Sequence, residues 1–177
     1  QTLFSGSNAG QASINGMHML LLGRWHDAYR LLVENAERVK NAQFNYLAAS
    51  LAAFERGDEL GWQFCLDRAE QKAGSQNFGI KSFRGMLEAR AGQPQKALAT
   101  LLALKRVAPA SPFVLKQIKD IYLELPDLEG LSGIIADLAK HKVVSEQELH
   151  SLNEKIFHHR LYVAEQSGIA EMRRVFH

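Results

Sequence analysis

The strongest constraint on the fold is a repeat of about 34 residues marked by glycine. Gly23, Gly57 and Gly92 are separated by 34 and 35 residues. Two further positions keep the same spacing in each repeat: Ala28, Trp62 and Ala97, and then Leu32, Leu66 and Leu101. A glycine accepts the left-handed backbone of a tight turn, and a small residue lets the next helix approach closely. A period of this length is typical of solenoids built from helix–turn–helix repeats.

The composition predicts that these repeats are entirely helical. The chain holds 24 Leu and 22 Ala, against only 18 Val, Ile and Thr together. Leucine and alanine lose little conformational freedom in a helix, whereas β-branched residues favour strands. The four prolines all fall between helical-looking segments: Pro94, Pro109, Pro112 and Pro126. The predicted fold is therefore an all-α, TPR-like (tetratricopeptide-like) α-solenoid of antiparallel helix pairs followed by a longer helix.

The expected organisation is four helix pairs, at residues 9–39, 42–73, 77–107 and 112–140, after a poorly patterned segment at residues 1–8. Gly23, Gly57 and Gly92 are the expected hinges of the first three pairs. The fourth pair, with helices at 112–125 and 128–140, has Pro126 in place of a hinge glycine. Residues 145–177 form the last part, in which Ser145 and Glu148 make a capping-box signature that opens a long helix to about residue 166. Gly168 is expected to end it, and a further, truncated helix then begins.

Three short runs of sequence resemble the HemY family of proteobacterial inner-membrane TPR proteins. They are Leu20–Trp25 (Leu-Leu-Leu-Gly-Arg-Trp), Asn45–Ala49 (Asn-Tyr-Leu-Ala-Ala) and Pro112–Lys116 (Pro-Phe-Val-Leu-Lys). The resemblance spans roughly residues 16–175. It implies a TPR domain held on the cytoplasmic side of the bacterial inner membrane and associated with late steps of protohaem biosynthesis. It also implies two membrane-spanning helices upstream and further repeats downstream, and it supplies no catalytic residues.

The charge and cysteine counts exclude several classes of function. The chain has 21 Lys and Arg against 19 Asp and Glu, so binding of nucleic acid through bulk charge is not expected. Cys65 is the single cysteine, which excludes an internal disulfide and is expected to be a small buried apolar residue. No apolar run approaches the roughly 18 residues of a membrane span. We therefore expect this stretch to be soluble and to reach the membrane only through a segment outside it.

No motif predicts catalysis or a metal site. The chain lacks a Gly-x-Ser-x-Gly nucleophile turn and a phosphate-binding loop. His150 and His158 share one face of the long predicted helix, with Glu154 between them. They are candidate haem ligands, and the alternative is a solvated or partner-facing stripe. We expect no metal site and no required cofactor, with haem as the one candidate.

A partner-binding groove is predicted on the first helix of each pair, because those helices line the concave face of a TPR solenoid. In the second pair, apolar residues recur at i, i+3, i+7 and i+10: Phe44, Leu47, Leu51 and Phe54. Equivalent positions in the other pairs add Met17, Leu20, Met86, Phe113 and Lys116. The alternative is that these side chains are core, buried against the next repeat or against the long helix folded back into the groove. If exposed, the stripe would also favour a homodimer.

These observations lead to a hypothesis of a non-enzymatic scaffold for protein–protein interactions, with haem-biosynthesis enzymes as the expected partners. The first alternative is a module that binds or transfers haem or another porphyrin directly. An enzyme acting late in haem synthesis is the weakest reading, because no catalytic set is visible in the sequence.

Overall fold

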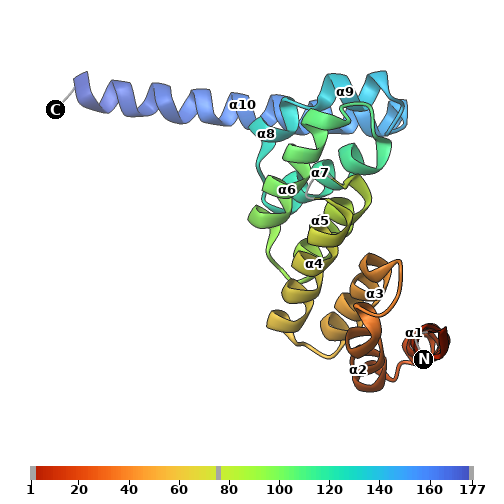
Figure 1. The fold of residues 1–177 in the computed structure, drawn as a ribbon. Coiled ribbons are helices and arrows are strands. Elements are labelled where there is room, and N and C mark those ends of the chain that lie inside the picture. Colours follow the sequence, from red (N-terminus) through yellow and green to blue (C-terminus); the bar gives the residue numbers. More distant parts are fainter. Residues whose placement is uncertain (1–2, 75–76, 176–177) are drawn as a thin grey trace. The chain divides into compact units, whose positions relative to one another are not determined.

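A computed structural model of the chain describes residues 3–74 and 77–175, and its regular structure there is entirely helical (Figure 1). The helices in chain order are α1 (Leu3–Leu21), α2 (Trp25–Ala36), α3 (Ala42–Glu55), α4 (Glu59–Ala73), α5 (Phe78–Arg90), α6 (Pro94–Val107), α7 (Pro112–Glu124), α8 (Leu128–Ser132), α9 (Ile135–Lys140) and α10 (Glu146–Val175). The predicted all-α fold is confirmed. The chain divides into two compact units, residues 1–87 and 88–177.

The three hinge glycines adopt the left-handed backbone that ends a helix and starts the next one. Their φ angles are +70° at Gly23, +75° at Gly57 and +70° at Gly92. At each hinge the glycine N–H donates to the carbonyl three residues earlier, at 2.9 to 3.1 Å, and the next N–H donates to the carbonyl five residues earlier, at 2.9 Å. This is the paired bonding of a Schellman cap. At the α7–α8 connection Asp127 makes the equivalent five-residue bond to Tyr122, at 2.9 Å, although Pro126 replaces the glycine.

The core of the first unit lies between α1, α2, α3, α4 and α5. Half of its buried residues are alanines, which let the helices approach closely, and larger side chains such as Leu32, Trp62 and Leu66 fill the remaining space. Trp62, which occupies a small-residue position of the repeat, is only 3% exposed. Its ring packs edge-on against Phe54, with 6.3 Å between centroids, in the same cluster as Ala53. Trp62 stands where the other repeats have alanine. The small side chain of Ala53, in the same cluster, leaves room for its indole ring.

Glu37, directly after α2, connects three helices of the first unit. Its carboxylate accepts hydrogen bonds from Tyr46 Oη of α3 at 2.8 Å, and from Arg68 Nη2 and Lys72 Nζ of α4 at 2.5 Å each. The hydrogen bond from Lys72 and that from Tyr46, followed by Arg68, lower the pKa of Glu37 from 4.5 to about 2. A carboxyl group whose pKa is lower in the folded than in the unfolded state stabilises the fold above its unfolded pKa.

This gives a pH-dependent expectation for Glu37→Gln. The wild-type chain should be more stable than the variant at pH 6, and the difference should shrink as the pH falls from about 4.5 towards 2, where Glu37 becomes protonated. Urea midpoints of both proteins at pH 6, 4 and 2.5 measure the difference, and comparing the two cancels the titration of the other acids. An equal difference at pH 6 and pH 2.5 would show that the charge of Glu37 contributes nothing.

The second unit packs α6, α7, α8, α9 and the first half of α10 around one apolar core. Residues 128–140, predicted as a single helix, form two short helices instead, with Gly133 and Ile134 between α8 and α9. Gly130 lies so close to α7 that an added Cβ would stand 2.3 Å from Cε1 of Tyr122. The absence of a side chain there lets α8 pack directly on the buried Tyr122 ring.

Two predicted helix boundaries are wrong. Helix α10 runs without interruption through Gly168, so this residue does not end it. A glycine inside a helix costs about 1 kcal/mol relative to alanine, which flanking helix formers such as Ala164, Ala170 and Glu171 can offset, and no proline follows to force a turn. At the other end, α1 begins at Leu3, so most of the segment 1–8 is helical despite its weak pattern.

Candidate partner-binding surfaces

Most of the predicted groove residues are partly buried in the core of their own unit. Met17, Leu20 and Leu47 pack against one cluster of the first unit, and Leu51, Phe54 and Met86 against the other. These six side chains follow the alternative that the sequence left open. The remaining three are exposed: Phe44 at 56%, Phe113 at 49%, and Lys116. Phe44 belongs to the first unit and the other two to the second, so neither unit by itself contains a surface made of all three.

Helix α10 is held to the second unit by one face of its first half. Leu152 and Ile156 are 3% and 6% exposed and belong to the apolar core. Lys119 of α7 donates to Glu148 in the first turn of α10, at 2.5 Å. Further along, Arg160 makes a two-pronged pair with Glu129 of α8, at 3.1 and 3.0 Å. After Arg160 no residue of α10 whose side chain the structure describes is buried (Figure 1).

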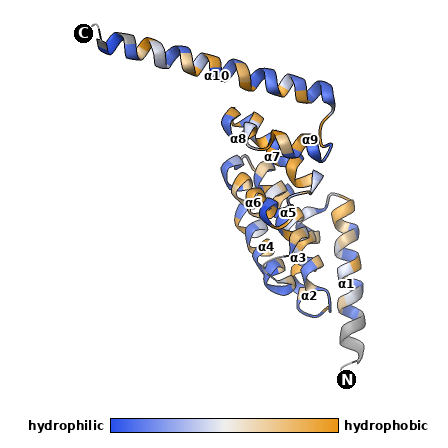
Figure 2. Ribbon diagram, turned by 90° about the horizontal axis from the view of Figure 1, so that it is seen from above, coloured by the Kyte–Doolittle hydropathy of each residue, from blue (hydrophilic) through white to orange (hydrophobic). Residues whose placement is uncertain are grey.

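The second half of α10 and the residues just before it carry large apolar side chains that are exposed and do not belong to the core of the unit. Five of them are between 40% and 64% exposed: Phe157, Leu161, Tyr162, Val163 and Ile169. Figure 2 shows the apolar segments that follow one another along this helix. At about 100° per residue, Phe157, Leu161, Ala164 and Gly168 share one side of α10, roughly 130° around the axis from Leu152 and Ile156. We call these four residues the free apolar face of α10.

The free apolar face is not among the predicted surfaces, because a helix that ends at Gly168 does not contain the whole of it. The signal was present in the spacing Phe157, Leu161, Ala164 and Gly168, which steps by four, three and four residues. Only a continuous helix places Gly168 in line with the other three.

The two candidate haem ligands lie on exposed parts of α10 and are not brought together by the fold. The His150 side chain is 78% exposed, and its Nε2 lies 3.3 Å from a carboxylate oxygen of Glu154. His158 is exposed and packs edge-on against the ring of Phe157, with 5.8 Å between centroids. Eight residues separate the two histidines, which is about 12 Å along a helix axis. No group of three or more potential metal ligands occurs within residues 3–74 and 77–175.

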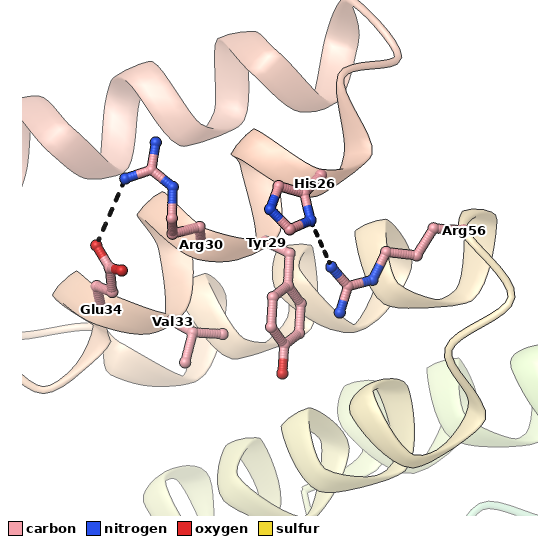
Figure 3. Close-up of a pocket in the computed structure, with 6 residues that line it drawn as sticks. All are labelled: His26, Tyr29, Arg30, Val33, Glu34 and Arg56. Atoms are coloured by element: carbon pink, nitrogen blue, oxygen red, sulfur yellow. Dashed lines mark hydrogen bonds and ion pairs between the residues drawn. The ribbon is translucent and has the colours of Figure 1, made fainter.

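A pocket of about 360 Å³ opens on the outer side of α2 in the first unit (Figure 3). It is lined by His26, Tyr29, Arg30, Val33 and Glu34 of α2 and by Arg56 from the turn after α3. The guanidinium carbon of Arg56 stands 4.2 Å from the centre of the Tyr29 ring. Its Nη1 lies 3.3 Å from Nδ1 of His26. No pattern in the sequence predicts this pocket, because Arg56 is 30 residues from His26.

Cys65 is part of the core of the first unit, and its thiol interacts with Tyr29, one of the residues that line this pocket. Its side chain is fully buried, and burial raises the pKa of its thiol to about 12. Burial also raises the pKa of Tyr29, whose hydroxyl hydrogen-bonds the same thiol. Both groups are therefore neutral at physiological pH.

Comparison with known proteins supports the repeat fold and connects it to one group of bacterial proteins. No model of a protein family matches the chain. It is 28% identical over 133 residues to Protein HemY of Escherichia coli K12 and to the same extent to Protein HemY of Shigella flexneri. The match covers 75% of this chain but only about one third of the length of these relatives. None of the helices in the described parts of the chain is long and apolar enough to cross a membrane.

Two solved structures share the fold over nearly the whole chain. The MamA double mutant described as RS-1 ArsTM superimposes with a TM-score of 0.67 at 20% identity, covering 97% of both chains. MamA residues 41 to the end, from Desulfovibrio magneticus RS-1, gives a TM-score of 0.66 at 20% identity. The chain is thus a TPR-like helical-repeat protein, similar in sequence to part of HemY and in fold to MamA.

Proposed function

We propose that this chain is a non-enzymatic adaptor that binds protein partners through the free apolar face of α10. The observation that carries this proposal is the set of large apolar side chains left exposed on a helix that is itself firmly anchored to its unit. Large exposed apolar patches on water-soluble domains mark interaction surfaces. The TPR-like fold supports the proposal, because stacked helical repeats form extended surfaces for other proteins.

The free apolar face is suited to a partner helix. Full burial of a side chain such as Phe157 or Leu161 contributes about 1.5 to 3 kcal/mol, so these two anchors together contribute about 3 to 6 kcal/mol to binding. Ala164 and Gly168 lie one turn apart between these anchors and the end of the helix. Their small size lets the backbone of a second helix come close, as in other helix-in-groove recognition.

Charge favours an acidic partner helix over a parallel pair of α10 helices from two copies of this chain. Basic residues lie along the free apolar face and after it: His158, His159 and Arg160 follow Phe157, and Arg173 and Arg174 follow Gly168. An antiparallel pair of α10 helices centred on this face would place Arg160 beside Glu165 and Arg173 beside Leu152 of the other copy, so charge does not oppose that arrangement. A parallel pair would place each arginine beside its own equivalent. A partner helix with acidic residues on both sides of an apolar stripe avoids this repulsion.

The biological setting that we propose is late protohaem biosynthesis at the cytoplasmic side of the bacterial inner membrane. Its support is the similarity to HemY over 75% of the chain. The partners would then be enzymes of the last steps of that pathway, which the adaptor holds near one another.

The test is a binding measurement with the purified enzymes of those last steps from the same bacterium. We expect at least one to bind, and Leu161→Asp to weaken it by about 30-fold, the loss of one hot-spot side chain. The matched control is Leu60→Asp, because Leu60 is 81% exposed in the first unit and lies off α10. Equal binding by all three proteins would reject the α10 surface, and no binding by any enzyme would reject the haem-pathway setting.

A haemin titration separates the adaptor from a direct haem-binding module. Because His150 and His158 are exposed and two turns apart, we expect a gradual, non-saturating absorbance change that His150→Ala and His158→Ala leave unaltered. Absorbance between 350 and 450 nm measures it at increasing haemin concentration. Saturation at one haemin per chain, with a Soret shift weakened by either substitution, would instead favour haem or porphyrin binding.

A further inference from the structure

The pocket on α2 belongs to the first unit, whereas the free apolar face of α10 belongs to the second. Its five α2 residues stand at i, i+3, i+4, i+7 and i+8 and so share one side of the helix. The buried side of α2 carries Ala28, Leu32 and Ala36 instead. The pocket is therefore an open surface feature of the first unit, and Tyr29 and Val33 of its lining also pack against the core.

Arg56 is held in place at the edge of the pocket before any ligand arrives. One face of its guanidinium stacks on Tyr29, and its edges contact His26 and the carboxylate of Asp58. These contacts leave some of its five N–H donors without a partner among the pocket residues. The carboxylate of Asp58 also caps the first turn of α4, because its other oxygen accepts a hydrogen bond from the Gly61 N–H at 2.8 Å. A guanidinium fixed in this way loses little further entropy when it binds a planar anion.

Arg30 supplies a second cation at the other side of the pocket. Its nearest carboxylate oxygens, on Asp27 and Glu34, are both 3.9 Å away, and its side chain is 53% exposed. Exposed pairs at this distance are weak, so an incoming anion can compete for Arg30. Val33 and the Tyr29 ring form an apolar floor between the two arginines (Figure 3). Two arginines against one glutamate give the lining a positive formal charge.

From this arrangement we infer that the pocket binds the side-chain carboxylate of an acidic residue in an extended segment of a protein partner. A carboxylate fits the planar donors of Arg56 and Arg30, and the apolar side chains next to it in the segment fit Val33 and Tyr29. The volume of about 360 Å³ is at the lower end of the range for ligand pockets, which suits one or two side chains. This site adds to the proposed function, and its test does not involve α10.

The test is an NMR titration of the ¹⁵N-labelled full chain with the peptide acetyl-Ala-Leu-Glu-Leu-Ala-amide. We expect saturable shifts of the backbone amides of residues 26–34 and 56, and about tenfold weaker binding of the same peptide with Gln in place of Glu. Arg30→Gln, an exposed substitution that leaves the core intact, should weaken binding by a similar factor. Glu34→Gln should strengthen it severalfold, because it removes the one like charge from the lining. Arg106→Gln, an exposed arginine of the second unit, is the control and should change nothing.

Three results would overturn the inference. The first is no shift of these amides with the Glu peptide at 10 mM. The second is equal binding of the Glu and Gln peptides, or of wild type and Arg30→Gln. The third is that sodium propionate shifts the same amides at the same concentration as the peptide, since the pocket would then take free carboxylates rather than a protein segment. Because Leu161→Asp leaves this pocket untouched, failure here and failure of the α10 surface are separate outcomes.

Discussion

Leu66→Ala should lower the free energy of unfolding of the first unit by about 3 kcal/mol, whereas Leu60→Ala should change it by less than about 0.5 kcal/mol. Both leucines belong to α4 and lie less than two turns apart. Leu66 is fully buried at a position that recurs in each repeat, and Leu60 is 81% exposed. Truncation of Leu66 loses buried apolar surface and leaves a cavity beside Trp62, while truncation of Leu60 loses neither.

Urea denaturation followed by tryptophan fluorescence measures this difference for the first unit alone, because both tryptophans, Trp25 and Trp62, belong to it. The slope of the transition should stay the same in all three proteins, which shows that only stability has changed. Similar losses in the two variants would mean that the 34-residue register does not identify the core of the repeat.

Glu148→Gln should destabilise the second unit by about 2 kcal/mol, because it leaves the charge of Lys119 without its closest partner. The Lys119 residue is only 8% exposed, and its Nζ lies 2.5 Å from Glu148 and 3.3 Å from Asp120. Burial by itself lowers the pKa of Lys119, but the hydrogen bond to Glu148 and the charge of Asp120 raise it above its usual range. The lysine therefore stays charged. Without Glu148, only Asp120 offsets the free-energy cost of burying this charge, and the second unit loses stability.

Glu146→Gln is the matched control, since Glu146 occupies the same first turn of α10 and is equally close to the positive end of the helix dipole. Urea denaturation followed by the NMR signals of residues 114–122 in α7 reports on the second unit. Equal losses in the two variants would assign the effect to the helix dipole and not to the contact between α7 and α10.

The repeat could be predicted because it depends on local chemistry. Gly23, Gly57 and Gly92 each adopt the positive φ that few other residues accept, and each makes the same two hydrogen bonds. Such turns depend on residues close together in the chain, so their spacing can be read directly from the sequence. The buried Leu32, Leu66 and Leu101 follow because a fixed distance from each hinge places them on the same face of the second helix.

The surfaces could not be predicted, because spacing alone does not distinguish a core face from a free one. Leu47, Leu51 and Phe54 have the pattern expected of a groove, yet they pack partly against the cores of the first unit. The free apolar face of α10 has a similar pattern but is exposed and lies outside the core of its unit. The pocket on α2 depends on Arg56, which only the tertiary fold brings to Tyr29 and His26.

The most direct test of the central claim is hydrogen exchange along α10 in the free chain and in its complex with a partner enzyme. We predict that amide protection over residues 157–171 rises at least tenfold in the complex, while protection in α1 to α4 stays unchanged. This result would place the partner on the free apolar face. Increased protection confined to other helices, with residues 157–171 unaltered, would contradict the account.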